Sequence, residues 1–342
     1  MLIETVKSLC AMFGPSGCED EVRDAIRKQA EPWADELNIT PQGTLLIYKK
    51  GRTSPKKTVM LSTHMDEPGL MVRRITEDGF LRFSLIGDMD RRTVLGKKVF
   101  LGDKRVPGII GMKPIHLTEK GERERIPKEE DLYIDIGAYQ KDRAEAMVEP
   151  GSFGCFDGGV AELQNGCFRA KAIAGRAGCG ILLGLLKQEL PVDVWFAFTV
   201  QKELGSKGAF GAAYTLRPDV ALVLDGAGAD LPHQEGKAQG PVLGGGPVIA
   251  LMDRGTVYDP ELSRMLQEAA ETKGIPCQTQ ARCDGHTDAR AIQTSLGGSR
   301  VCGLSVPIRS LHTPACVCSG ADLEAAKALS VAFLEKLEEE NG

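Results

Sequence analysis

The sequence predicts an α/β protein, a mixed sheet flanked by helices, with a smaller β-rich domain inserted into the chain. Its 342 residues suffice for two domains, or for one large α/β domain with an insertion. Helical and strand-like patterns alternate in residues 1–66 and again in residues 166–342, which we expect to form one domain. Residues 67–165 instead carry short β-like runs between glycines, prolines and charge clusters, which predicts an all-β insertion.

The individual elements follow from hydrophobic periodicity and turn residues. Apolar residues at helical spacing predict a first helix that ends at the turn of residues 14–17, and a second helix has Val22 and Ile26 on one face. Ser319 and Asp322 form a capping-box pattern at the start of the terminal helix. Strands are expected at residues 44–48, 58–61, 70–72, 106–110, 132–136, 192–200, 219–224, 247–251 and 300–306, and later helices at residues 179–190, 260–273 and 321–339.

Composition argues against several classes of protein. The 42 basic and 47 acidic residues give a net charge of −5, which argues against nucleic-acid and membrane partners. The first residues lack the pattern of a secretory signal, and the longest apolar runs are far shorter than the ~20 residues of a membrane span. Ten cysteines scattered along the chain indicate reduced thiols. We therefore expect a cytoplasmic protein.

Histidines and carboxylates lie just beyond the ends of four expected strands. They are His64 with Asp66, Glu203 beside Lys202, Asp225, and His312. Ligands of open α/β sheets bind outside the carboxyl ends of the strands, so we expect these side chains to meet at one edge. Two imidazoles and two carboxylates suit zinc, cobalt or manganese. Each residue taken singly is equally well explained as an ordinary cap or loop residue, but their shared placement favours a site.

Several sequence segments, taken in chain order, point to one family. They are GPSG (residues 14–17), STHMDEPGLMV (62–72), KPIHL (113–117), DLYIDIGA (131–138), TVQKELG (199–205), TDA (287–289) and RSLHTP (309–314). Together they resemble the motifs of the tetrahedral (glutamyl, deblocking) aminopeptidases, which are co-catalytic two-metal peptidases. The resemblance implies a metallo-aminopeptidase-like mixed sheet flanked by helices, interrupted by a small β-barrel-like dimerisation domain. This agrees with the insertion expected above.

The resemblance also assigns roles by position. The residues that it assigns to the two metals, in pairs, are His64 with Asp225 and Glu203 with His312. Asp66 would orient His64, because a carboxylate behind a metal-bound imidazole fixes its tautomer and raises its basicity. The candidates for the substrate cleft are His286, Asp288 and Arg309. For His286 a solvent-facing loop position is the favoured alternative.

Two segments depart from the family pattern. The family has K-A-x-D-D-R-x-G-C, whose first Asp bridges both metals, whereas this chain has KAIAGRAGC, with Ala174 at the bridging position and Gly175 after it. The family also has Glu-Glu where this chain has Lys202-Glu203. The first Glu is the general base, and a cationic lysine cannot accept that proton. If only these residues are missing, Ala174→Asp, Gly175→Asp and Lys202→Glu together are expected to recover metal binding.

Charge counting argues against two metals. Asp66, Glu203 and Asp225 carry three negative charges and Lys202 one positive charge, so the site has a charge of −2 without metal. One divalent ion would neutralise this charge, whereas two would leave a buried +2. We therefore expect zero or one divalent metal (zinc, cobalt or manganese), with the Lys202 ammonium in the place of a metal.

The sequence thus predicts a homologue of a metal-dependent aminopeptidase, acting on the N-terminal residues of short peptides, with impaired or absent catalysis. Two alternatives stay open. One is a hydrolase of peptide-like substrates that uses a single metal or the help of Lys202. The other is a pseudoenzyme that binds peptides or is a structural partner of an active paralogue. The resemblance further implies a homodimer through the insertion and, at its largest, a hollow dodecamer that admits only short peptides or peptide-like small molecules.

Overall fold

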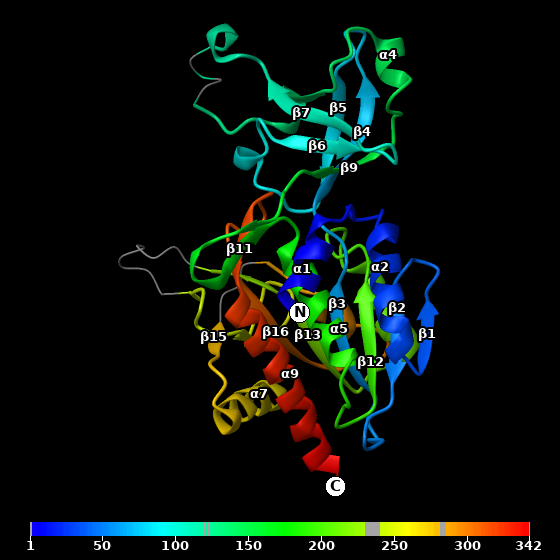
Figure 1. The fold of residues 1–342 in the computed structure, drawn as a ribbon, viewed down its shortest axis with the longest axis vertical. Helices are drawn as coiled ribbons and strands as arrows, with labels where there is room; N and C mark the ends of the chain where they lie inside the picture. Colours follow the sequence, from blue (N-terminus) through cyan, green and yellow to red (C-terminus); the bar gives the residue numbers. More distant parts are fainter. Residues whose placement is uncertain (1, 120, 122–123, 230–239, 281–284, 342) are drawn as a thin grey trace.

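The molecule consists of a mixed α/β body and a closed β-barrel that stands at one end of it (Figure 1). This computed structural model describes residues 2–119, 121, 124–229, 240–280 and 285–341. The predicted fold class, a mixed sheet flanked by helices and interrupted by a small barrel, is confirmed. No helix of the described residues combines the length and apolar content that a membrane span requires.

The large sheet places four strand ends at one edge. In the described part of the chain it has eleven strands, nine of them in the order β1-β2-β12-β3-β13-β16-β17-β11-β10, and β14 pairs with β15 and β16 beside this path. Strands β12, β3, β13 and β16 are parallel neighbours, so their carboxyl ends lie together. The strands are β1 (Glu36–Ile39), β2 (Leu45–Lys49), β3 (Val59–His64), β10 (Ala161–Glu162), β11 (Cys167–Ala170), β12 (Val194–Thr199), β13 (Val220–Gly228), β14 (Val248–Ala250), β15 (Gln278–Gln280), β16 (Arg300–Arg309) and β17 (Cys316–Ser319).

Helices cover both faces of this sheet. Strand β13 shows the alternation, because Leu222 and Leu224 belong to one hydrophobic core and Ala221 and Val223 to another. The first core also contains α1 (Leu2–Ala11), α2 (Asp20–Ala30), α5 (Ile173–Leu186), α7 (Pro260–Lys273) and α9 (Gly320–Asn341). The second contains α6 (Lys207–Leu216) and α8 (Ala289–Gln293). Figure 1 shows α1, α5 and α9 in front of the sheet.

Helix α5 begins at Ile173, earlier than the start at residue 179 expected from the sequence. Its glycines lower helix propensity, which hides the start, but close packing requires them. A Cβ atom on Gly178 would lie 2.1 Å from Thr63 Oγ1, and one on Gly180 would lie 2.4 Å from Val6 Cγ2. The contacts of this helix with β3 and α1 therefore determine where it begins.

The barrel follows directly on β3, at the edge where the parallel strands end. Its strands close in the order β4-β5-β8-β7-β6-β9 around a core of their own, which includes Leu70, Phe83, Val99 and Ile134. They are β4 (Gly69–Ile75), β5 (Leu81–Ile86), β6 (Lys98–Leu101), β7 (Val106–Met112), β8 (Leu132–Asp135) and β9 (Phe153–Phe156), with the short helix α4 (Lys141–Glu145). The barrel therefore lies where it can cover this edge of the sheet.

The predicted capping box pairs Asp322 with Ser319 at the start of the terminal helix, but the Asp322 side chain has other partners in the structure. The Asp322 carboxylate accepts hydrogen bonds from the backbone N–H groups of Gly244 (2.8 Å) and Gly246 (2.9 Å). It therefore fastens the loop before β14 to α9.

The nine cysteines of the described residues are free thiols.

The Asp259 carboxylate joins the start of α7 to β16 and yields a test of the fold. It accepts hydrogen bonds from the backbone N–H groups of Glu261 and Leu262, both at 3.0 Å, and its two oxygens accept from Arg300 at 2.7 and 2.9 Å. The bonds from Arg300 lower the pKa of Asp259 to about 2. A lowered folded-state pKa stabilises the fold above the unfolded pKa, and this stability is lost as the pH falls toward 2.

We predict that Asp259→Ala lowers the free energy of unfolding by about 1–2 kcal/mol at pH 7, because the helix cap is lost. The difference between wild type and variant should shrink as the pH falls from about 5 to 3. Thermal unfolding followed by circular dichroism measures both. Glu261→Ala, which removes a 69% exposed partner of Arg300, is the matched control and should cost less than about 0.5 kcal/mol. Equal costs for the two variants would contradict this account of the cap.

Candidate active site at the junction of sheet and barrel

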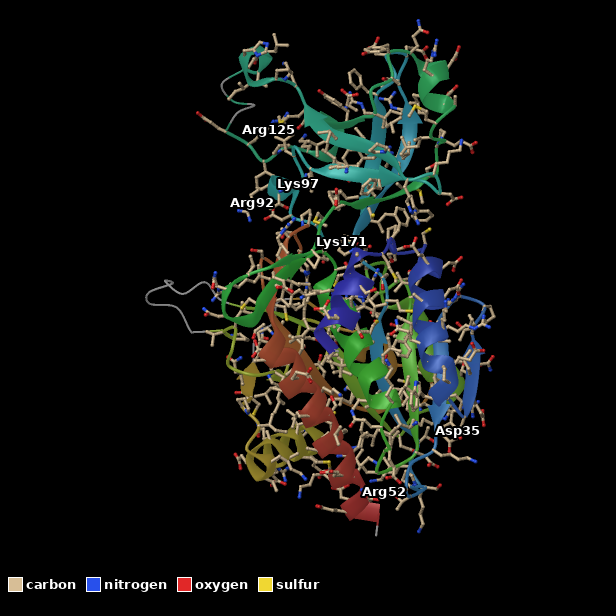
Figure 2. The ribbon with its side chains drawn as sticks, viewed as in Figure 1. Asp35, Arg52, Arg92, Lys97, Arg125 and Lys171 are labelled. Atoms are coloured by element: carbon tan, nitrogen blue, oxygen red, sulfur yellow. The ribbon has the colours of Figure 1, made fainter. Side chains whose placement is uncertain are left out.

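A cavity of about 330 Å³ lies at the carboxyl ends of the parallel strands, where the barrel meets the α/β body. We call it the junction cavity. The α/β body contributes the residues that the sequence singled out: His64, Asp66, Ala174, Lys202, Glu203, Asp225, His286 and His312. The barrel contributes Asp88, Met89 and Phe156. Figure 2 shows Lys171, a further wall residue, at the height where the two bodies meet.

A buried carboxylate organises the floor of this cavity. Asp66 accepts hydrogen bonds from the backbone N–H groups of Lys202 (3.1 Å) and Glu203 (3.0 Å), and its Oδ1 lies 3.2 Å from His64 Nδ1. Burial alone would raise the pKa of Asp66, but His64 and the two N–H groups outweigh burial and lower it to about 2. Asp66 thus fixes both the ring of His64 and the turn that follows β12.

His64 points its other nitrogen toward Asp225. Its Nε2 lies 3.4 Å from Asp225 Oδ1, a charge contact whose geometry leaves this buried nitrogen without a hydrogen bond within the described chain. Burial alone would lower the pKa of His64, but the Asp225 and Asp66 carboxylates raise it to about 10. The imidazole is therefore a cation at neutral pH in this arrangement.

The Lys202 side chain lies between two carboxylates. Its Nζ is 3.3 Å from Glu203 Oε1 and 4.0 Å from Asp225 Oδ2, and the residue is only 8% exposed. Burial alone would lower the pKa of Lys202, but Asp225 and Glu203 raise it above its usual value. The pKa of Asp225 is held below its usual range, because Lys202 and His64 outweigh the effect of burial. Lys202 is therefore an ammonium ion at neutral pH.

A loop of the barrel reaches into the same site. The second oxygen of Glu203 accepts a hydrogen bond from the Asp88 backbone N–H at 3.2 Å, and the Asp90 N–H donates to the His312 carbonyl at 3.0 Å. Gly87, with φ of +79°, packs directly on the Glu203 side chain. The loop at residues 87–90 thus connects the barrel to two of the residues that the resemblance assigns to metals.

The first turn of α5 has two positions with different amounts of space. Ala174 lines the cavity and packs on Gly226, the residue after Asp225, where an added Cβ would lie 3.0 Å from the Ala174 Cβ. A Cβ on Gly175 would instead lie 2.3 Å from the His64 carbonyl oxygen. A side chain added at position 175 would therefore require the backbone at His64 to shift.

The side chains present do not form a ready metal site. Within the described ranges, no group of three or more His, Cys, Asp or Glu side chains is arranged to hold a metal ion. Lys202 Nζ lies between the carboxylates of Glu203 and Asp225, which the resemblance assigns to different metals. The described donor set therefore does not fit a two-metal centre.

Of the three residues predicted for the substrate cleft, one lines the junction cavity and two do not. His286 is a partly exposed loop residue that lines the junction cavity. Asp288 is buried and accepts a hydrogen bond from the Thr199 hydroxyl at 2.5 Å, and burial raises its pKa. Neither Asp288 nor Arg309 is among the described residues that line the cavity.

Sequence reasoning missed a buried ion network beside the cavity. Glu67 Oε1 accepts hydrogen bonds from Lys171 Nζ at 2.5 Å and from the Gly14 N–H at 3.1 Å, and it lies 3.5 Å from Arg176 Nη2. Arg176 is fully buried and donates to the carbonyl oxygens of Met65 and Leu9, both at 2.6 Å. The signal was present, because Glu67 belongs to the first motif and both basic residues belong to the segment without its two Asp residues.

The inserted barrel and the histidine- and carboxylate-lined cavity at the strand ends are the features that the resemblance to the aminopeptidases implies. Residues 43–329 match the M42 glutamyl aminopeptidase family, to which this chain belongs. A putative aminopeptidase of Acetivibrio thermocellus is 34% identical over 333 residues, which cover 96% of this chain and 97% of that protein.

Solved structures agree with this family. An aminopeptidase from the archaeon Desulfurococcus kamchatkensis superposes with a TM-score of 0.93 at 34% identity, over 99% of this chain and 97% of that one. The TET1 peptidase of Pyrococcus horikoshii superposes with a TM-score of 0.86 at 32% identity, over 97% of this chain and 98% of that one. The latter can assemble into a tetrahedron or a large octahedral shell.

Contact between Gly87 and Glu203 yields a prediction. We expect Gly87→Ala to destabilise the protein by about 1–3 kcal/mol more than Gly96→Ala, because its Cβ would lie 2.8 Å from the Glu203 Cβ. Gly96 has a similar positive φ of +73° and open space around it, so it controls for backbone strain. Chemical unfolding of both variants measures the difference. Equal stability would show that the barrel loop does not press on Glu203.

Proposed function

We propose that this chain is a non-hydrolysing member of the M42 family that binds short peptides, or peptide-like small molecules, in the junction cavity. The observation that carries the proposal is the position of Lys202 Nζ, 3.3 Å from Glu203 and 4.0 Å from Asp225. Position 202 is where the resemblance expects the general base. A charged ammonium has no lone pair for a proton, and the two carboxylates stabilise its charged form.

The electrostatics of the buried site support the absence of a two-metal centre. Glu203 and Asp225 need a nearby cation, because isolated buried charges are heavily penalised. Lys202 supplies that cation from within the chain. A metal ion would have to displace the ammonium and leave it buried without its partners, which is costly. Ala174 adds no donor at the bridging position.

The cavity itself supports peptide binding. Its volume of about 330 Å³ suits a ligand of a few residues. Polar groups (His64, His286, Thr287) and apolar ones (Met252, Leu311) both line it. We further propose that the chain forms a homodimer through the barrel and a larger homo-oligomer, as the assembly of the Pyrococcus horikoshii relative suggests.

A mononuclear hydrolase is the second candidate. One observation favours it: all four side chains that the resemblance assigns to metals, His64, Glu203, Asp225 and His312, line the same cavity. In that case one divalent ion of zinc, cobalt or manganese would enter with a rearrangement of Lys202. The two candidates make opposite predictions for peptide cleavage.

We predict that peptides bind and stay intact. Calorimetric titration with a panel of tripeptides that differ in the first residue should give saturable binding. Mass spectrometry after prolonged incubation with zinc, cobalt or manganese should detect no released amino acid. Metal-dependent release of N-terminal residues would contradict the non-hydrolysing function and support the mononuclear hydrolase.

Restoring part of the family pattern should restore metal binding. We expect the Ala174→Asp/Lys202→Glu double variant to bind divalent zinc or cobalt, because it adds two carboxylates and removes the competing ammonium. Adding Gly175→Asp should lower the melting temperature and weaken that binding, because its Cβ would collide with the His64 carbonyl oxygen. Elemental analysis and thermal unfolding compare the two variants. A triple variant that binds metal more tightly than the double variant would contradict this reading of position 175.

A further inference from the structure

We call the part of the cavity lining formed by Asp88, Ala250, Met252 and Asp253 the outer wall. It carries a carboxylate, Asp253, that neither the resemblance nor the proposed function uses. Asp253 lies after β14, and its Oδ2 accepts hydrogen bonds from the Tyr258 hydroxyl at 2.8 Å and from the Thr287 hydroxyl and N–H, both at 3.3 Å. Its Oδ1 accepts from the Gly255 N–H at 2.7 Å. Both oxygens are thus held in place before any ligand arrives.

The support behind Asp253 is rigid. Tyr258 is 3% exposed, and its ring packs on Gly303 of β16, where an added Cβ would lie 2.8 Å from the ring. Burial raises the pKa of Tyr258, as do the nearby carboxylates of Asp253 and Asp225. Tyr258 therefore lies near both the outer carboxylate and the inner site, and it stays a neutral hydrogen-bond donor.

The donors to Asp253 among the described residues are neutral hydroxyl and backbone N–H groups. In the described part of the chain, no cationic group lies within ion-pair distance of Asp253 or of Asp88, the other acidic residue of the outer wall. The lining residues as a whole include six carboxylates, two lysines and the His64 imidazolium, which lies between Asp66 and Asp225. Lys171 is paired with Glu67, and Lys202 lies between Glu203 and Asp225. The outer wall therefore presents negative charge to a ligand.

Two further features match a cationic peptide. The side chains of Ala250 and Met252 line the cavity on the strand and loop that lead to Asp253, and they offer an apolar surface for the methylenes of a long basic side chain. His64 Nε2 is buried, lines the cavity and lacks a hydrogen-bond partner among the described groups. It is a separate polar position for a peptide carbonyl oxygen.

We propose that the junction cavity selects peptides whose first residue carries a positively charged side chain, lysine or arginine, and that Asp253 is the carboxylate that binds this charge. The inference rests on the proposed function, because it names the ligand class of the same cavity. Preorganised carboxylates bind cations well, since no reorganisation is needed at the moment of binding.

The test compares peptides that differ in charge but not in shape. Calorimetric titration uses Lys-Ala-Ala, norleucine-Ala-Ala, whose side chain has the same length without the charge, and Glu-Ala-Ala. We expect Lys-Ala-Ala to bind about tenfold more tightly than the norleucine peptide, and Glu-Ala-Ala more weakly than either. Equal affinities of the lysine and norleucine peptides, or a preference for glutamate, would overturn the inference and leave peptide binding standing. No binding of any of the three would overturn the proposed function and this inference with it.

A variant pair assigns the selectivity to one residue. Asp253→Asn keeps one acceptor oxygen and removes the charge, so it should reduce the preference for lysine over norleucine to about one. Asp142→Asn, an exposed acidic residue of α4 on the barrel, is the matched control and should change neither affinity. An unchanged preference in Asp253→Asn with a native melting temperature would overturn the role of Asp253. The wild-type comparison keeps the test decisive even if that variant folds poorly.

Discussion

The Lys202 ammonium compensates two buried carboxylates, Glu203 after β12 and Asp225 in β13, and the arrangement of the site depends on this contact. Glu203 follows β12 and Asp225 lies in β13, and both strands run parallel to β3, which lies between them. Without a cation between them, their charges would repel each other in a region of low solvent access. The ammonium removes this repulsion with an atom of the chain itself. In our account it thereby also removes both the need for a metal at this point and the proton acceptor that hydrolysis requires.

Polar contacts of the backbone hold this arrangement together. Asp66 links His64 to the turn after β12, and the barrel loop at residues 87–90 holds Glu203 and the His312 segment from the opposite side. The Glu67 network joins the first helix, the strand leading into the barrel and the start of α5. The cavity therefore keeps its shape through contacts from both bodies, which is the property that a binding site needs.

Much of the fold could be predicted from the sequence, and the remainder depended on long-range contacts. The parallel strands were visible as apolar runs, and strand ends pointed to residues that the structure gathers around one cavity. The start of α5 was not visible, because Gly178 and Gly180 are poor helix formers that only the contacts with Thr63 and Val6 explain. Asp322 carries a local capping signal, but its partners lie in a distant loop. Asp253 and Tyr258 belong to no motif, so only the folded structure brings them to the cavity wall.

Anomalous diffraction at the zinc edge, on crystals grown without chelator and soaked in zinc, tests whether the Lys202 ammonium takes the place of a metal. We expect no anomalous peak in the junction cavity, with Lys202 Nζ in density between Glu203 and Asp225. A peak at about 2.0–2.2 Å from His64 Nε2 and a carboxylate oxygen of Asp225, with Lys202 turned away, would contradict it.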